Sequence, residues 1–219
     1  MMPRDFSYYI SRILSVMFHP LLMPLYGVTA LTLSVYQSGD ANRYLMAPIL
    51  GTTIQNTCLW TFTVPVGALL IMRMTGYLSS LRMHIQGERT LPYFICSVCY
   101  IVWCVRLGIA RVPLEWLLIA MGGTLALFIV AVVNHRWKIS AHSTGAGGMT
   151  GSVLAYAVAT GFFSWTIVLL SAFIAISVMC ARIRLQKHTS AQVTAGWLVG
   201  MLCTLMPVFI YSITSLPNA

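Results

Sequence analysis

Long apolar stretches, most of them long enough to cross a lipid bilayer, constrain the fold of this chain more than any other feature. A transmembrane helix needs about 20 predominantly apolar residues, and its backbone must satisfy its own hydrogen bonds inside lipid. The stretches cover 13–36, 45–72, 92–107, 114–133, 149–180 and 193–213. The stretch 149–180 is long enough for two spans with a turn near 161–165. We therefore expect an all-α polytopic membrane bundle with six to seven transmembrane helices.

The composition agrees with this interpretation. Of the 219 residues, 58% are hydrophobic and 8% are charged, and the mean hydropathy is +0.83. Such values are far too apolar for an ordinary soluble domain. Because no internal repeat or linker interrupts the pattern, we expect one membrane-embedded domain over 1–219.

The first apolar stretch contains His19 and Pro20, which leave two interpretations open. A proline inside a helical pattern kinks or ends the helix. The stretch is then one bent span, or 13–24 form a separate segment at the membrane interface.

The charged residues are strongly unbalanced, with 13 Lys and Arg against 4 Asp and Glu, a formal net charge of +9. The four acids are scattered, which argues against chemistry by paired carboxylates and against a carboxylate-held magnesium cluster. These acids are Asp5, Asp40, Glu88 and Glu115. The basic residues gather in short segments between apolar stretches, which favours lipid phosphates or a phosphorylated lipid as partners, rather than nucleic acid.

Three charged segments, 77–92, 134–148 and 181–192, are separated from one another by even numbers of predicted spans. We therefore expect all three on the same membrane face, where they can meet at one site. Outside that site, basic residues are more numerous on this face than on the other. The positive-inside rule then favours the cytoplasmic side.

Each segment carries groups suited to binding or transferring phosphate. Arginine offers planar paired donors to phosphate oxygens, and two histidines from different segments can act as nucleophile and acid without a metal. The candidates are Arg82, Arg89, Ser140, His142, Arg182 and His188. The glycines at 145, 148 and 151 either approach the phosphate through their backbone or pack helices together.

In order and spacing, these residues resemble the type 2 phosphatidic acid phosphatase superfamily over 82–192. That family carries the motifs K-x6-R-P, P-S-G-H and S-R-x5-H-x3-D. The matching residues here are Arg82-x6-Arg89, Ile139-Ser140-Ala141-His142 and Arg182-x5-His188-x3-Gln192. Arginine replaces the lysine at 82, alanine the glycine at 141, and glutamine the aspartate at 192.

The resemblance implies His188 as a nucleophile that forms a phosphohistidine, and His142 as the acid that protonates the leaving group. It implies a phosphate site made of Arg82, Arg89, Ser140 and Arg182, with no cofactor and no metal, in a bacterial inner membrane. Gln192 stands where the family's aspartate holds the other ring nitrogen of the nucleophile.

Helix geometry adds two expectations for the third segment. In a continuous helix Gln192 lies one turn beyond His188, so its amide oxygen can accept the bond from the imidazole. In the same helix Arg184, and not Arg182, lies close to the side of His188, so a role for Arg182 requires a break in the helix.

The sequence thus predicts a metal-independent membrane phosphatase that acts on a lipid phosphate or diphosphate, without choosing among such lipids. The alternative is a catalytically degenerate relative that binds or transports a phosphorylated lipid, which the replacements Ala141 and Gln192 favour. A structural membrane protein is a third interpretation. A zinc site from His135, His142 and His188 is the alternative to metal-free chemistry.

Overall fold

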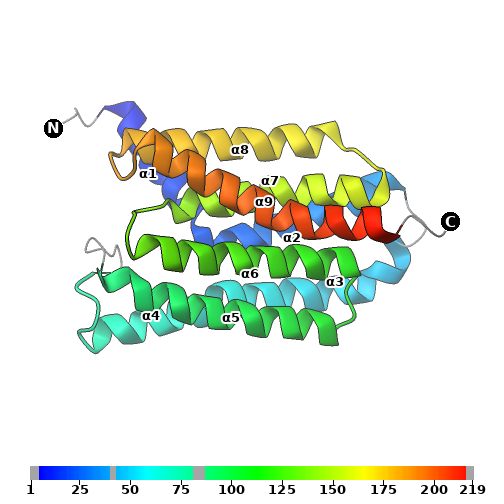
Figure 1. Ribbon diagram of the computed structural model, residues 1–219, viewed down its shortest axis with the longest axis horizontal. Helices are drawn as coiled ribbons and strands as arrows, with labels where there is room; N and C mark the ends of the chain where they lie inside the picture. The colour runs from blue at the N-terminus through cyan, green and yellow to red at the C-terminus, as the bar shows by residue number, and fades with distance from the viewer. Residues whose placement is uncertain (1–4, 40–42, 81–86, 216–219) are drawn as a thin grey trace.

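The computed structural model describes residues 5–39, 43–80 and 87–215, without the side chains of 43–48. Within these ranges every regular element is a helix, and together the helices form a polytopic membrane bundle (Figure 1), as the sequence predicts. The elements are α1 (Phe6–Met17), η1 (Pro20–Leu22), α2 (Met23–Ser38), α3 (Arg43–Thr57), η2 (Cys58–Thr63), α4 (Val64–Met74), η3 (Gly87–Arg89), α5 (Thr90–Ile109), α6 (Leu114–Asn134), α7 (Ala141–Thr160), α8 (Trp165–Arg184) and α9 (Ser190–Ser215).

By length and composition, five helical stretches of the described chain can each cross a membrane. They are Ile49–Met74, Gly87–Ile109, Leu114–Asn134, Trp165–Arg184 and Ser190–Ser215. The pair Phe6–Met17 and Pro20–Ser38 is bent by 44° and makes a sixth stretch if the two helices are counted as one span. Helix α7, with 20 residues, runs beside them in the bundle and is not among these stretches (Figure 1).

The first pass begins earlier than its apolar stretch suggests. The Asp5 carboxylate accepts a hydrogen bond from the backbone N–H of Tyr8 at 3.0 Å and so caps α1, whose first residue is Phe6. The helix ends at Met17, and Pro20 begins the next helical turn. The chain therefore bends between residues 17 and 20, and α1 is a distinct helix at an angle to α2.

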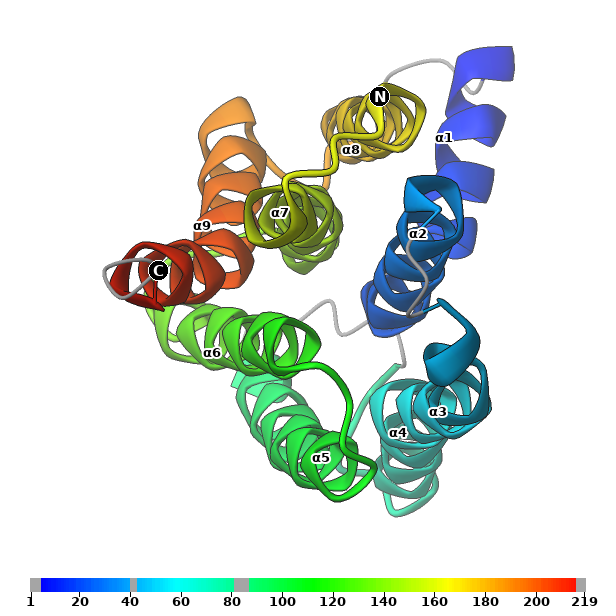
Figure 2. The same ribbon diagram turned by 90° about the vertical axis from the view of Figure 1, so that its right-hand side faces the viewer.

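Helix α7 lies inside the bundle, in contact with α9, α2, α8 and α6 (Figure 2). It begins at Ala141, so the prediction of a polar segment running to residue 148 was wrong. Ser140 caps the helix by accepting the N–H of Ser143 at 3.4 Å. The hydroxyls of Thr144 and Thr150 donate to carbonyls one turn back in the same helix, which makes a polar sequence tolerable in the interior.

Helices α7 and α9 approach closely because glycines line their contact. A Cβ on Gly147 would collide with the backbone of Trp197, and a Cβ on Gly200 would collide with the carbonyl of Thr144. Helix pairs in membranes associate through such small residues. The two helices can therefore lie this close because glycine has no side chain at the contact.

The glycines at 145, 148 and 151 belong to the same packing. A Cβ on Gly145 would meet the side chain of Met23 on α2, and Gly148 and Gly151 both face Thr204 on α9. All three lie within the continuous helix α7 and not in a phosphate-binding loop. Of the two interpretations of these glycines, the structure favours helix packing.

The prediction that the charged segments share one end of the bundle is confirmed. The α4–α5, α6–α7 and α8–α9 connections all lie at the end where α1 begins, on the left of Figure 1. The α2–α3, α5–α6 and α7–α8 connections lie at the opposite end. Residues 81–86 of the first charged segment, which include Arg82, are outside the described residues.

The packing of α7 against α9 predicts a strong asymmetry among glycine substitutions. We expect Gly147→Ala to lower the free energy of unfolding by about 1–3 kcal/mol, because the added methyl overpacks the helix contact. Gly67→Ala in α4 is the matched control, since nothing lies within 4 Å of its added Cβ. Thermal unfolding of both variants in the same detergent measures the difference. Equal stability of the two variants would contradict the close contact.

Candidate functional site

A cavity of about 740 Å³ begins among the basic residues of the charged end and continues into the bundle. Residues from all three charged segments line it. They are Arg89, Lys138, His142, Arg182, Lys187 and His188. The described part of the chain contributes no aspartate or glutamate to this lining. The site is therefore cationic without compensating acids, which suits a phosphate or diphosphate group.

The structure brings together four of the residues singled out in the sequence, Arg89, His142, Arg182 and His188. Two others have different positions. Ser140 is fully buried, caps α7 and does not line the cavity. Gln192 lies in the first turn of α9, also outside the cavity lining.

The third charged segment is not one continuous helix. Helix α8 ends at Arg184 and α9 starts at Ser190, and between them Gln186 adopts a positive φ of 52°. The expectation of His188 and Gln192 on one helix was therefore wrong. The turn folds His188 back to the side of Arg182, so the break that a role for Arg182 requires is present.

Arg182 lies at the cavity with its guanidinium only partly hydrogen-bonded. Its Nη1 donates to the hydroxyl of Ser15 at 3.4 Å. Its Nε is buried and has no hydrogen-bond partner among the described residues. A largely buried positive charge is costly unless an opposite charge lies beside it, and the described residues that line the cavity include no carboxylate. An anionic ligand would lower this cost.

His188 is held in a defined tautomer. Its Nδ1 lies 3.3 Å from the carbonyl oxygen of Lys138, and since a carbonyl only accepts, the proton is on Nδ1. Burial and then the charge of Arg182 lower the pKa of His188 to about 4, although the hydrogen bond to the Lys138 carbonyl acts in the opposite direction. The imidazole is therefore neutral at pH 7, and its Nε2 carries the free lone pair that a nucleophile needs.

Gln192 forms a capping box at the start of α9. Its Oε1 accepts the backbone N–H of Thr189 at 3.1 Å, and the Thr189 hydroxyl accepts the N–H of Gln192 at 3.4 Å. The T-x-x-Q pattern at 189–192 is the sequence signal for this helix start. The Gln192 side chain also raises the pKa of His188 through a hydrogen bond, a weaker effect than that of the Lys138 carbonyl.

His142 occupies the first turn of α7 and contacts α1. Its Nε2 lies 3.1 Å from the carbonyl oxygen of Ser15, so Nε2 carries a proton and Nδ1 is the nitrogen left for other partners. The ring of His19 packs edge-on against it, with the centroids 5.6 Å apart. The second histidine is thus positioned by the N-terminal helix.

The N-terminal segment adds residues to the site that the motif pattern did not include. Tyr8 and Arg12 of α1 line the cavity, as does His19, which caps η1. The available signal was His19 and Arg12 within and beside an apolar stretch, since polar or ionisable residues in membrane segments often mark functional sites. The sequence indicates a bend near Pro20 but not its direction toward the other segments.

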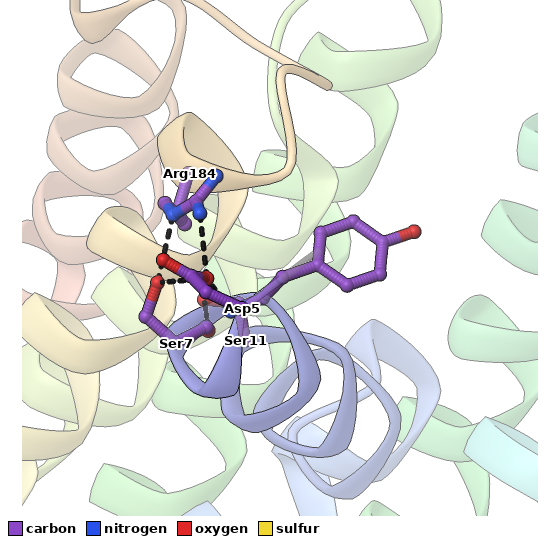
Figure 3. A network of polar contacts seen from close by, with 5 residues as sticks. Asp5, Ser7, Ser11 and Arg184 are labelled. Atoms are coloured by element: carbon purple, nitrogen blue, oxygen red, sulfur yellow. Dashed lines mark hydrogen bonds and ion pairs between the residues drawn. The ribbon is translucent and has the colours of Figure 1, made fainter. Parts of the chain in front are cut away.

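A polar network fixes α1 against the end of α8 (Figure 3). Arg184 Nη2 lies 2.7 Å from the Asp5 carboxylate, and Arg184 Nε donates to the Ser7 hydroxyl at 2.8 Å. The hydrogen bond from Ser7, then that from the Tyr8 N–H and the charge of Arg184, lower the pKa of Asp5. Arg184 is thereby turned away from the cavity, and Arg182 is left to face it.

The basic side chains of the site repel one another. Burial lowers the pKa of Lys138, and the charges of Arg89, Lys187 and Arg182 lower it further. An anion bound among them reverses this effect, because it stabilises each protonated form.

The residues around the site do not form an evident metal centre. Across the described ranges, no three His, Cys, Asp or Glu side chains are grouped so that they could hold an ion. His135, part of the alternative zinc site, is exposed, whereas His142 and His188 line the cavity.

Comparison of the chain with protein-family models, with curated proteins and with solved structures found no match.

Two substitutions separate the capping role of Gln192 from its effect on His188. Gln192→Glu keeps the capping box and adds a negative charge, so we expect the pKa of His188 to rise well above 4 with little change in stability. Gln192→Ala removes the side-chain cap and should lower stability by about 1 kcal/mol.

Nuclear magnetic resonance titration of histidine-labelled protein in detergent measures the pKa, and His188→Ala assigns the signal. An unchanged pKa in Gln192→Glu would show that the side chain at 192 does not reach the imidazole.

Proposed function

We propose that this protein is a metal-independent membrane phosphatase that hydrolyses a lipid phosphate or diphosphate through a phosphohistidine. The observation that carries the proposal is the cavity in which Arg89 and Arg182 lie together with His142 and His188. The residues come from the three charged segments at one end of the bundle, and the same cavity continues into the apolar interior. A phosphate head group and its hydrocarbon part would both be accommodated.

In the first step, Nε2 of His188 attacks phosphorus while the guanidinium groups of Arg89 and Arg182 bind the non-bridging oxygens. A P–N bond forms as the P–O bond to the leaving group breaks. His142 enters this step protonated on both ring nitrogens, a form that the bound phosphate favours. It donates its Nδ1 proton to the departing oxygen, which leaves as an alcohol or as a lipid monophosphate, and it keeps the Nε2 proton on the Ser15 carbonyl.

In the second step, water attacks the phosphohistidine and gives its proton to His142. The P–N bond breaks, inorganic phosphate departs, and both histidines return to their starting states. The neutral form of His188 and its free Nε2 suit the first step, and its Nδ1–H bond to the Lys138 carbonyl keeps the ring oriented in both.

A second candidate function is binding or transport of the same lipid without hydrolysis. It is favoured by the capping roles of Ser140 and Gln192, because two positions that resemble a phosphatase site are engaged in helix starts. The two functions share the head-group site and differ in whether a bond breaks.

The decisive experiment measures phosphate release from a panel of lipid phosphates and diphosphates by the purified protein. We expect release that a chelator leaves unchanged and that vanadate, a mimic of pentacoordinate phosphorus, inhibits. His188→Ala should abolish release while binding of the lipid persists, because the arginines remain. Release by His188→Ala would exclude the phosphohistidine, and binding without release by the unmodified protein would favour the second function.

His142→Ala tests the acid in the same assay. An alkyl phosphate needs protonation of a poor leaving group, whereas an aryl phosphate with an acidic phenol does not. We expect the variant to lose far more activity on the alkyl substrate. Equal losses on the two substrates would show that His142 is not the acid.

We place the site on the cytoplasmic side of a bacterial inner membrane, following the positive-inside rule. Ser79 is exposed at the charged end, and Thr160 is exposed at the opposite end. Single cysteines at these positions, in a background without the six native cysteines, can be labelled in intact cells. We expect protection at Ser79→Cys and reaction at Thr160→Cys, and the reverse pattern would overturn this orientation.

A further inference from the structure

The cavity does not end at the basic residues but follows one face of each of several helices into the bundle. On α5 the lining residues recur at intervals of three and four, from Arg89 at the cap through Tyr93, Cys96, Tyr100 and Trp103 to Leu107. That spacing marks a single helical face. Helices α2, α6 and α7 line the other sides.

Helix geometry gives the length of this inner part. Residues Arg89 and Leu107 are 18 positions apart, which at a rise of 1.5 Å per residue corresponds to about 27 Å. The hydrocarbon core of a bilayer is about 30 Å thick, so each leaflet contributes about 15 Å. The cavity therefore passes the midplane and reaches far into the second leaflet.

Three hydroxyls of α7 and α9 along the cavity already donate to backbone carbonyls. Thr144 donates to Ser140, Ser152 donates to Gly148 at 2.6 Å, and Thr204 donates to carbonyls of both α7 and α9. Apolar side chains make up much of the remaining inner lining, among them Val28, Leu31, Ile119 and Leu127. The inner cavity therefore suits hydrocarbon.

The deep end is closed from the surroundings. Leu31 and Leu107 are each 2% exposed and Trp116 is 4% exposed, although all three line the cavity. A chain that enters from the charged end therefore stops at this wall of α2, α5 and α6.

We propose that this channel holds hydrocarbon of the substrate, extended from the head group among the basic residues to the wall at Leu107 and Trp116. The inference rests on the proposed function for its head group and adds the length of the hydrocarbon chain. The same cavity of about 740 Å³ includes the basic residues and this wall.

The length of the channel also restricts the length of the substrate's hydrocarbon chain. An ordinary acyl chain matches about one leaflet, about 15 Å, and would leave the deep half empty. A chain long enough to pass the midplane fills it. The substrate class is therefore an amphiphile with a phosphate or diphosphate head and a chain longer than one leaflet, either a long linear alkyl or an isoprenoid chain.

Gly123 offers a way to shorten the channel without disturbing the fold. It lines the cavity, and no atom lies within 4 Å of a Cβ built on it. It is 11 residues from Asn134 at the charged end of α6, or about 16 Å. The substitution Gly123→Leu should therefore close the channel near the midplane. Leu125→Phe is the control, because Leu125 is 49% exposed on the outer side of α6 and does not line the cavity.

The probes are non-hydrolysable phosphonates with linear alkyl chains of increasing length, and a matching isoprenoid series. Their dissociation constants are measured for the three proteins in one detergent. The ratio of variant to unmodified protein at each length cancels partition of the probe into micelles. Thermal unfolding confirms that the variants are folded.

For Gly123→Leu we expect this ratio of dissociation constants to stay near one for short chains and then to rise by up to about fourfold for each methylene that would lie beyond residue 123, until the chain reaches the wall. For Leu125→Phe the ratio should stay near one at every length. The alkyl and isoprenoid series distinguish the two sources of the chain, since the chain that fits the unmodified channel better gives the steeper rise of the ratio.

These experiments distinguish failure of the channel proposal from failure of the proposed phosphatase. If Gly123→Leu leaves the ratio near one at every chain length, the channel proposal is overturned even when phosphate is released. If the ratio rises with chain length as expected but no substrate releases phosphate, the channel stands and the phosphatase is excluded. Release from phosphatidate with ordinary acyl chains that equals release from longer-chain substrates, and is insensitive to Gly123→Leu, would also overturn the channel.

Discussion

The close approach of α7 and α9 is the constraint on which the rest of the site depends. Glycines bring the two backbones together, and at the charged end the N–H of Ser140 donates to the carbonyl of Gln192 at 3.3 Å. This bond joins the starts of the two helices. It places His142, two residues after Ser140, and His188, just before α9, at the same cavity, although they are 46 positions apart.

Much of the membrane topology was predictable because it follows from local properties. Apolar length identifies five of the passes directly, and counting passes places the charged connections at one end. Helix α7 was harder, since a helix surrounded by other helices needs no apolar exterior and its small polar residues resemble a loop. The break after α8 depends on the capping box at Thr189 and Gln192, a signal of four residues among many similar ones.

The positive charge of the site was predictable from the sequence, whereas the contribution of α1 and the role of Ser140 were not. Arginines and histidines in three connections predicted a shared cationic site, and the structure brings Arg89, Arg182 and both histidines to one cavity. The contribution of α1 depends on the bend near His19, and sequence alone does not give the direction of such a bend. Likewise, the sequence allowed Ser140 either to bind phosphate or to cap a helix. In the structure its buried hydroxyl accepts a hydrogen bond from the backbone N–H of Ser143 and caps α7.

Exclusion of water links the two halves of the cavity. Burial that makes the inner part suitable for hydrocarbon also lowers the pKa of His188, and the charge of Arg182 acts in the same direction. A phosphate head group brings negative charge to both residues and reverses the second effect. Occupancy of the head-group site and protonation of the imidazole are therefore thermodynamically linked, so any ligand that binds more tightly to the protonated site must raise this pKa.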